Sequence, residues 1–384
     1  MSRPGTPSLL RAMNDRAVLD LLISEGPLTR TDLGGRTGLS KVTVSQLLSR
    51  LEARGLVEVV GSQAGSRGPN AALYCVVPTV GYAAGVDVGP DGITVAVADI
   101  TGAVRGRGAV PGGSDDLVDG LHKALSAATA EAGVPEDGLQ AVVIGTPGVV
   151  DPATDAVDLA IDVPAWSPEL PAALRARLRC RVSVENDVNL AALAEQAHGG
   201  AAGTDDFVLL WVSRGLGIGI VLGGRLHRGA SGGAGEVGYL PVPGTSLPRV
   251  VSDPRAAAFQ SLVGGHAVCA LAARHGLDDT DPAAAVAAAA ALPDHPLLDE
   301  LGERLAVGVA AICVVLDPSL VVLAGDVGRA GGAALAGRIQ RAVPRIAPVH
   351  PAVRPTEVAG EAVLTGAIHV AVATARDEVF DAPA

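Results

Sequence analysis

The sequence predicts an α/β protein made of a small N-terminal head and a two-lobed body. Two observations support this prediction: a helix–turn–helix–hairpin order near the N-terminus, and a meander of short strands that occurs twice further along. The chain has 384 residues, too many for one compact core and enough for two or three domains. Because aromatic residues make up only 2% of the chain, the core is expected to consist of Ala, Val, Leu and Ile.

Charge divides the chain in the same way. Residues 1–75 contain nine Lys and Arg against six Asp and Glu, a net charge of +3, and the remainder has 20 against 35, or −15. The overall charge of −12 argues against a protein that coats nucleic acid with its whole surface. A mildly basic head on an acidic body is typical of a DNA-reading module attached to a soluble sensor or enzyme.

Several classes of protein are disfavoured by simple patterns. The longest apolar run, Leu305–Leu316, has 12 residues and is too short to span a bilayer. No hydrophobic signal core follows the N-terminus, so a cytoplasmic protein without membrane contact is expected. The cysteines lack metal-ligand or redox spacing and are expected to be small buried side chains, not disulfides: Cys75, Cys180, Cys269 and Cys313.

The head, residues 1–78, begins with two predicted helices. Apolar residues at helical spacing within 18–23 predict a first helix that ends before Gly26-Pro27. Thr29-Arg30-Thr31-Asp32 resembles a capping box, so a second short helix is expected to begin there. The turn Gly38-Leu39-Ser40 then supplies an N-cap serine for a third helix.

The third helix is predicted over Lys41–Arg54. Its core-facing residues, at positions i, i+3, i+4 and i+7, are Val44, Leu47, Leu48 and Leu51. The opposite face combines a Gln suited to adenine, a methyl group suited to thymine, and hydroxyls suited to phosphate. The DNA-contacting residues predicted here are Ser40, Lys41, Val42, Thr43, Ser45, Gln46, Ser49 and Arg50.

A hairpin completes the head. Leu56–Val60 and Ala72–Val77 are predicted strands around a Gly/Ser-rich tip, in which Arg67 is expected to reach the DNA backbone or minor groove. This order of elements and the local positive charge predict a winged helix-turn-helix DNA-binding domain. The alternative is a three-helix protein-interaction module with a solvated polar face.

The body shows one strand pattern twice. Ala83–Asp99 and Phe207–Leu222 each contain two short apolar strands around a glycine turn. Helices and buried strands follow both: Leu117–Ala132, Gln140–Ile144, much of Ala256–Ala273, and Leu320–Leu323. The repeat predicts two similar lobes around a ligand cleft, an actin-like ATPase (ribonuclease H-like) fold. Residues 79–190 are assigned to the first lobe and 191–384 to the second, with the C-terminal helix a candidate to return to the first; Asp281–Pro296 is expected to be a surface helix.

Three motifs in the body resemble those of a known family. They are Gly145–Asp151 (GTPGVVD), Val184–Asn189 (VENDVN) and Gly232–Gly238 (GGAGEVG). Their order and spacing are typical of the ROK family, which groups repressors, bacterial sugar kinases and related reading frames. The head resembles that of the repressor branch, so the resemblance covers nearly the whole chain.

The motifs place polar groups suited to a sugar. Asn186 and Asp187 offer hydrogen-bonding groups for vicinal hydroxyls. Glu236 lies in the glycine-rich loop Gly229–Gly238, which brings backbone close to a ligand. The resemblance implies that these three residues bind sugar, and that Asp187 is the general base in a kinase. Without the resemblance, Asp187 as a helix cap or surface ion pair, and Glu236 as a solvated hinge residue, are the alternatives.

Departures from the family pattern change the expected ligand site. Tyr239 replaces the family's His, and Pro241–Ala258 lacks the Cys-rich zinc loop, so no bound metal is expected. Gln260 stands where the family has a sugar-binding Glu, so the ligand need not be a common hexose. The predicted ligand-binding residues are Gly148, Asn186, Asp187, Glu236, Tyr239 and Gln260.

The three turns that bind ATP in the family's kinases are also altered. In Asp87–Asp91 the proline removes an N–H donor and the last residue adds negative charge. Ser213–Gly219 lacks the usual Thr, and Ala324–Gly328 contains an acid, Asp326. Since phosphoryl transfer depends on positioned donors and Mg²⁺, we expect neither a nucleotide cofactor nor enzyme activity.

The sequence therefore predicts a sugar-responsive transcriptional regulator, a repressor, whose partners are operator DNA and a sugar or sugar derivative. A homodimer or homotetramer is expected, since paired recognition helices read paired half-sites. Two alternatives remain: an ATP-dependent sugar kinase with a fused head, which needs Asp187 as catalytic base, and an architectural DNA-binding protein whose body only oligomerises.

Overall fold

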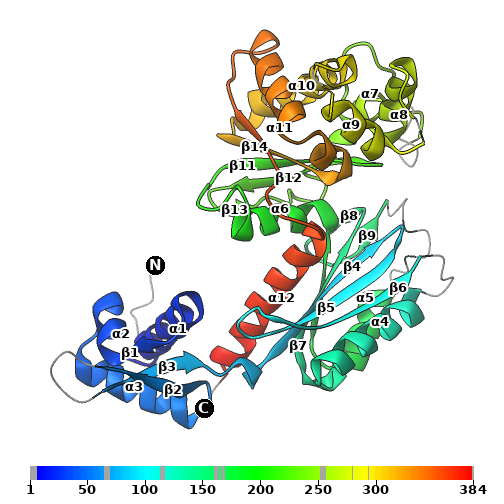
Figure 1. Cartoon of the computed structure of the whole chain (residues 1–384). Helices are drawn as coiled ribbons and strands as arrows, with labels where there is room; N and C mark the ends of the chain where they lie inside the picture. The colour runs from blue at the N-terminus through cyan, green and yellow to red at the C-terminus, as the bar shows by residue number, and fades with distance from the viewer. Residues whose placement is uncertain are drawn as a thin grey trace.

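The computed structural model describes residues 7–64, 70–112, 117–159, 163, 166, 169–250, 257–278, 280–292 and 294–382. Three sheets organise these residues into a head and two lobes (Figure 1). In the described part of the chain, no helix combines the length and apolar character that crossing a membrane requires.

The head has the predicted helix–turn–helix–hairpin order. Its elements are α1 (Pro7–Glu25), β1 (Leu28–Thr29), α2 (Arg30–Thr37), α3 (Lys41–Ala53), β2 (Val57–Gln63) and β3 (Ala71–Val76). Thr29 and Asp32 form the capping box that starts α2, and Ser40 caps α3. The predicted stripe of α3 is fully buried, which confirms its periodicity: Val44, Leu47, Leu48 and Leu51.

The first lobe is built on a sheet in the order β10-β7-β4-β5-β6. Its strands are β4 (Tyr82–Gly89), β5 (Gly92–Asp99), β6 (Val104–Pro111), β7 (Leu139–Thr146) and β10 (Arg181–Asn186), and a short hairpin pairs β8 (Val149–Val150) with β9 (Val157–Asp158). β4, β5 and β6 form an antiparallel meander, which β7 and β10 extend in parallel. One face packs on α4 (Leu117–Ala132) and α5 (Leu170–Leu178).

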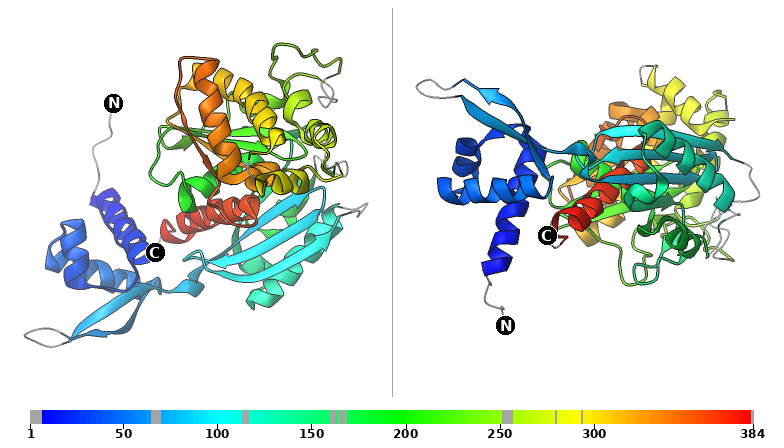
Figure 2. Two further views of the ribbon diagram at one scale, coloured as in Figure 1. Left: turned by 45° about the horizontal axis from the view of Figure 1, so that its top comes forward. Right: turned by 90° about the horizontal axis from the view of Figure 1, so that it is seen from below.

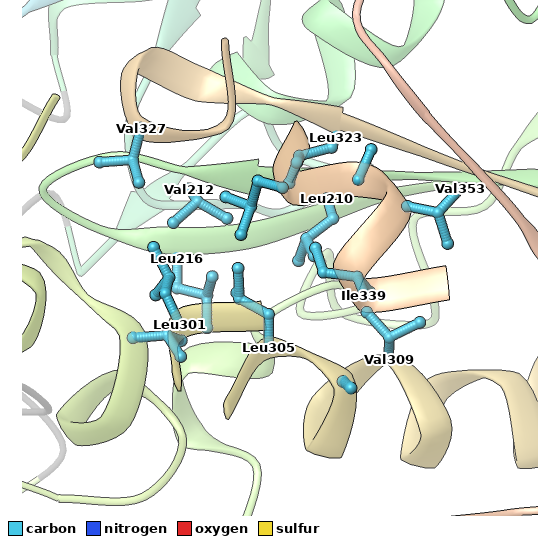
Figure 3. Packing of buried hydrophobic residues seen from close by; sticks show 14 of the residues in the cluster. Leu210, Val212, Leu216, Leu301, Leu305, Val309, Leu323, Val327, Ile339 and Val353 are labelled. Atoms are coloured by element: carbon cyan, nitrogen blue, oxygen red, sulfur yellow. The ribbon is translucent and has the colours of Figure 1, made fainter. Parts of the chain in front are cut away.

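The second lobe repeats this topology in the order β13-β12-β11-β14-β15. Its strands are β11 (Phe207–Val212), β12 (Leu216–Leu222), β13 (Arg225–Leu226), β14 (Leu320–Ala324) and β15 (Ala352–Pro355). One face packs on α7 (Gln260–Val263), α8 (Gly265–Arg274), α9 (Pro282–Ala290), α10 (Pro296–Leu316) and α11 (Gly325–Ala342), around the apolar core in Figure 3. The shared strand order confirms the predicted duplication.

Two helices fill the space between the two sheets. α6 (Asp187–His198) lies on the second sheet, and α12 (Ala362–Phe380) lies on the first sheet and crosses α6 (Figures 1 and 2). The crossing is tight, because a Cβ atom on Gly366 would lie 1.9 Å from the Leu190 carbonyl oxygen. The C-terminal helix therefore belongs spatially to the first lobe.

The structure adds detail to two local predictions. The stretch Ala256–Ala273, much of which is expected to be helical, contains two helices, α7 and α8, which meet at Gly264. In the Ala-rich segment Asp281–Pro296, expected as a surface helix, α9 forms with an exposed outer side and buries Val286 completely, and Pro296 begins α10. Alanine carries no strong amphipathic pattern, so composition alone did not indicate the buried face.

Candidate functional site

A cleft of about 1180 Å³ lies between the lobes. It is lined by the β4–β5 and β11–β12 turns and by the first residues of α6 and α12. The structure brings all six predicted ligand-binding residues to this cleft: Gly148, Asn186, Asp187, Glu236, Tyr239 and Gln260. They come from both halves of the body, so the site depends on how the two lobes are placed.

The start of α6 sets the position of Asp187. Asn186 is the N-cap: its side-chain oxygen accepts from the Asn189 N–H at 3.0 Å, and its amide donates to the Gly148 carbonyl at 3.0 Å. Asn186 is therefore the N-cap residue, and Asp187, the first residue of the helix, accepts from the Val188 N–H at 2.8 Å. One N–H and one lone pair of the Asn186 side chain are left for a ligand.

Glu185, a buried carboxylate that was not among the predicted site residues, holds the first residues of α6 in place. Glu185 accepts from the Asn186 N–H at 3.0 Å and the Asn189 amide at 2.8 Å. Its other oxygen pairs with Arg228 at 2.6 Å. Glu185 thereby ties α6 to the loop that carries Glu236. Its place in the VENDVN motif was visible in the sequence, but nothing local indicated Arg228 as its partner.

The glycine-rich loop is pressed against neighbouring strands. Gly232 and Gly235 have φ angles of 82° and 106°, and Cβ atoms there would lie 1.9 Å and 2.2 Å from the carbonyl oxygens of Val150 and Ile218. Only glycine fits both conditions. The loop leads into the short 3₁₀ turn Val237–Tyr239, which places Glu236 at the cleft.

Carboxyl groups dominate the electrostatics of the cleft. Burial, with the nearby charges of Asp187 and Glu361, raises the pKa of Asp87 to about 7. Burial and the charge of Asp187 also raise the pKa of Glu236. The pKa of the Tyr239 hydroxyl is raised by burial and by Glu236, so this hydroxyl remains a hydrogen-bond donor at neutral pH.

Side chains of the family's phosphate-binding turns pair with one another here. Arg214, in the β11–β12 turn, forms an ion pair of 2.8 Å with Asp91 in the β4–β5 turn. In the third turn, Asp326 accepts from the Ser213 hydroxyl at 2.9 Å. Pro90 supplies no N–H donor, and Asp91 and Asp326 add negative charge to these turns, so the residues present do not fit a nucleoside triphosphate with its metal.

The residues also do not fit the family's structural zinc. Among the residues that the structure describes, no group of three or more His, Cys, Asp or Glu is placed to hold a metal ion. In the described parts of the loop after Tyr239, no sulfur or imidazole ligand is present.

Gln260 connects the cleft to the β11–β12 turn. Its side chain is 8% exposed, and its amide donates to the Arg214 carbonyl at 3.1 Å. A carboxylate in this position would face that carbonyl without a donor. A Glu at this position is therefore disfavoured by the backbone arrangement seen here.

We expect Gln260→Glu to lower the free energy of unfolding by about 1–3 kcal/mol at neutral pH, the cost of an unsatisfied buried group. The loss should shrink as pH falls, because a protonated carboxyl regains a donor. Denaturant unfolding at several pH values measures the loss in the free energy of unfolding. Gln196→Glu is the control, since the half-buried Gln196 also donates to a carbonyl, that of Gly224, at 3.0 Å, and should lose less. Equal losses in the two variants would contradict this role.

The outer face of α3 is the candidate nucleic-acid interface. Exposed residues on it are Lys41, Val42, Gln46, Ser49 and Arg50, and Val42 is 67% exposed although it is apolar. Thr43 and Ser45 are half-buried. An exposed methyl group on this face is suited to contact with a thymine methyl.

Three of the predicted DNA-contacting residues have partners in the head, and a fourth lies outside the described residues. The Ser40 and Thr43 hydroxyls are 2.9 Å apart, and Ser40 also accepts from the Thr43 N–H. Arg50 pairs with Asp15 of α1 at 2.6 Å, so a phosphate would compete with that carboxylate. Arg67 lies outside the described residues.

Comparison with known proteins defines the class. The ROK family pattern matches residues 83–373, and the MarR family pattern matches residues 13–68. The first match covers well over half of the chain, so this protein belongs to the ROK family. Its head matches a family of winged-helix type, as the helix–turn–helix–hairpin order predicted.

Two curated relatives are a repressor and a transcriptional regulator by name. The xylose repressor of Bacillus subtilis strain 168 is 26% identical over 61% of this chain and 62% of the relative. The DNA-binding transcriptional dual regulator NagC of Escherichia coli K12 is 29% identical over 62% of this chain and 59% of the relative. The chain thus spans less than two thirds of the length of each.

Two solved structures share the fold. A ROK family transcriptional regulator, described as a homologue of the Escherichia coli MLC protein, covers 97% of this chain and 100% of its own with a TM-score of 0.74 at 20% identity. A ROK hexokinase from Thermus thermophilus covers 78% of this chain and 100% of its own with a TM-score of 0.63 at 28% identity. The fold is therefore shared by regulators and kinases, and it does not separate the two.

Proposed function

We propose that this protein is a sugar-responsive transcriptional regulator that acts as a repressor and not as an enzyme. The observation that carries the proposal is the combination, in one chain, of an exposed α3 face in a MarR-type head with a cleft that Asp187 and Glu236 line. The names of the curated relatives, a xylose repressor and NagC, support it.

In this proposal the head binds operator DNA. Val42 and Gln46 reach base edges in the major groove, and Lys41, Ser49 and Arg50 bind phosphate. Arg67, a contact expected from the sequence, binds the DNA backbone or minor groove. A homodimer or homotetramer in the cytoplasm would present two α3 helices to paired half-sites.

The cleft binds a sugar or sugar derivative. Asp187 and Glu236 accept from hydroxyl groups, and Tyr239 donates to a ring or hydroxyl oxygen. Asn186 adds its remaining N–H, whereas Gly148 and Gln260 shape the wall, since their backbone carbonyl and side-chain amide are engaged by the protein. A sugar that binds one lobe arrangement better than another shifts the protein toward it, and with it the spacing of the α3 helices.

Footprinting tests the proposal. DNA fragments selected for binding to the full chain are footprinted alone and with a panel that includes xylose, glucose and N-acetylglucosamine. We expect at least one sugar to weaken or shift the footprint. An unchanged footprint across a broad panel would refute control by sugars. Trp211 lines the cleft, so its fluorescence measures sugar binding independently of DNA.

Asp187→Ala separates sensing from DNA binding. We expect sugar affinity to fall about 10- to 100-fold, because hydrogen bonds to a charged group are lost, while DNA affinity without sugar stays within about twofold. Sugar affinity is measured by a titration monitored through Trp211 fluorescence, and DNA affinity is measured by a gel-shift assay. Asp326→Ala is the control in the same cleft, since Asp326 bonds Ser213. If the protein is instead an architectural DNA-binding protein whose body only oligomerises, Asp187→Ala should leave regulation unchanged.

A sugar kinase is the second candidate. Asp187 stands at the first turn of α6, and the similarity to a ROK hexokinase favours this reading. The Asp91–Arg214 ion pair and Asp326 argue against it, since they stand in the phosphate-binding turns. Calorimetry with Mg²⁺-ATP decides: tight binding together with sugar phosphorylation would overturn the proposal.

A further inference from the structure

α12 touches both functional parts of the molecule. Glu361, Ala362 and Val363, at its start, line the cleft. Its end shares an apolar cluster with the head, in which Phe380 is buried in the same cluster as residues of α1 and α3. The helix has 19 residues, a length of about 28 Å (Figure 1).

The cleft end of α12 is held by one arginine from each lobe. Arg107, on β6 of the first lobe, pairs with Glu361 at 2.6 Å. Arg329, on α11 of the second lobe, donates to the Gly360 carbonyl at 3.1 Å. A change in the distance between the lobes must therefore move the start of α12 or break one of these bonds.

The middle of α12 has no room to slide independently. Gly366 packs against the Leu190 carbonyl of α6, the helix that begins with Asp187. On the other side, a Cβ atom on Gly85 of β4 would lie 2.6 Å from the Ile368 nitrogen. Backbone contacts of this kind transmit displacement, because there is no flexible side chain to absorb it.

The guanidinium of Arg54 bonds the head end of α12 to α3. Arg54 is the C-cap residue of α3, and its Nη2 donates to the carbonyls of Val379, Phe380 and Ala382 at 3.2, 3.0 and 3.0 Å. The last carbonyls of a helix lack partners within the helix, so a cation there is favourable. Arg16 of α1 adds an ion pair to Asp377 at 2.6 Å.

We propose that α12 couples the cleft to the head, and that Arg54 is the positioning residue through which α3 follows α12. The inference rests on the proposed function, since it states how a cleft that binds sugar controls a head that binds DNA. Any ligand that changes the lobe arrangement then moves α12 at Glu361 and Gly366, and α3 moves with its far end.

Hydrogen exchange on the full chain tests this coupling without sugar or DNA. We expect Arg54→Ala to speed amide exchange about fivefold or more in residues 361–366 and 187–190, within the range of allosteric coupling. A lost cap alone is felt only in the adjoining turn. Arg54→Lys should restore part of the protection, because an ammonium group also donates to carbonyls. Arg36→Ala, which breaks an ion pair to Glu25 inside the head, is the control.

The reverse experiment uses the cleft end. Arg107→Ala should speed exchange in α3 and in residues 376–382 by a similar factor, because coupling between two sites is reciprocal. Changes confined to the turn next to each substitution would overturn the proposal. If no sugar alters the footprint but exchange remains coupled, only the proposed function fails. If sugars release DNA but exchange is uncoupled, only the role of α12 and Arg54 fails.

Discussion

Glu195→Ala is expected to lower the free energy of unfolding by about 3–5 kcal/mol, near the upper limit for a single substitution. Glu195 lies in α6 and is fully buried. One carboxylate oxygen accepts from the Thr356 hydroxyl and the backbone N–H groups of Glu357 and Val358, and the other accepts from the Gly200 N–H at 2.9 Å. Alanine would leave these four donors without an acceptor inside the protein.

The loss of stability would act on the segment that connects the two lobes, and the proposed function depends on how the lobes are placed. Residues 356–358 join β15 of the second lobe to α12 of the first, so Glu195 organises the connection between the lobes. Thermal or denaturant unfolding measures the loss. Glu357→Ala, at the exposed neighbouring position, is the control and should change stability by less than about 0.5 kcal/mol. A similar small change for Glu195→Ala would show that water replaces its hydrogen bonds.

Features encoded by local patterns could be predicted from the sequence. The buried apolar residues of α3 recur at the spacing of a helix. Each of the two meanders combines short apolar strands with glycine turns. The residues that line the cleft could also be predicted from the family motifs, two of which lie at the ends of β7 and β10. Asn186 shows the limit: its capping bond to Asn189 is local, whereas its amide bonds the Gly148 carbonyl, 38 residues away, which no local pattern indicates.

Pairings between distant side chains could not be predicted. Arg54 and Phe380 lie 326 residues apart, and Arg214 and Asp91 lie 123 apart. Each arginine looks like an ordinary surface residue when only its neighbours in sequence are considered. Glu195 is similar: an acid on a helix is normally exposed, and its burial follows from where the β15–α12 connection passes. Such contacts depend on the placement of whole lobes, which no local period encodes.

The second large effect concerns Asp87 and pH. Its pKa is about 7 in the folded protein, against an ordinary value of 3.8. Because the folded protein binds this proton more tightly than the unfolded chain, the group stabilises the fold at low pH, and this contribution is lost as pH rises from about 4 through 7. Asp87→Asn cannot ionise. We therefore expect the variant to gain stability over the wild type with rising pH, up to about 4 kcal/mol at pH 8 and little near pH 4.

Denaturant unfolding of both proteins from pH 4 to pH 8 measures this difference, and comparing the two cancels the other titrating groups. Asp137→Asn, at an exposed carboxyl of the first lobe, should differ from the wild type by less than about 0.5 kcal/mol at every pH. A difference for Asp87→Asn that does not change with pH would mean that its carboxyl is not protonated near neutrality. If the dependence is seen, the shift of the Asp87 pKa should fall when Asp187→Ala is added, because the Asp187 carboxylate is part of its cause. That coupling would place the two carboxyl groups in one cleft by a measurement that requires neither DNA nor a sugar.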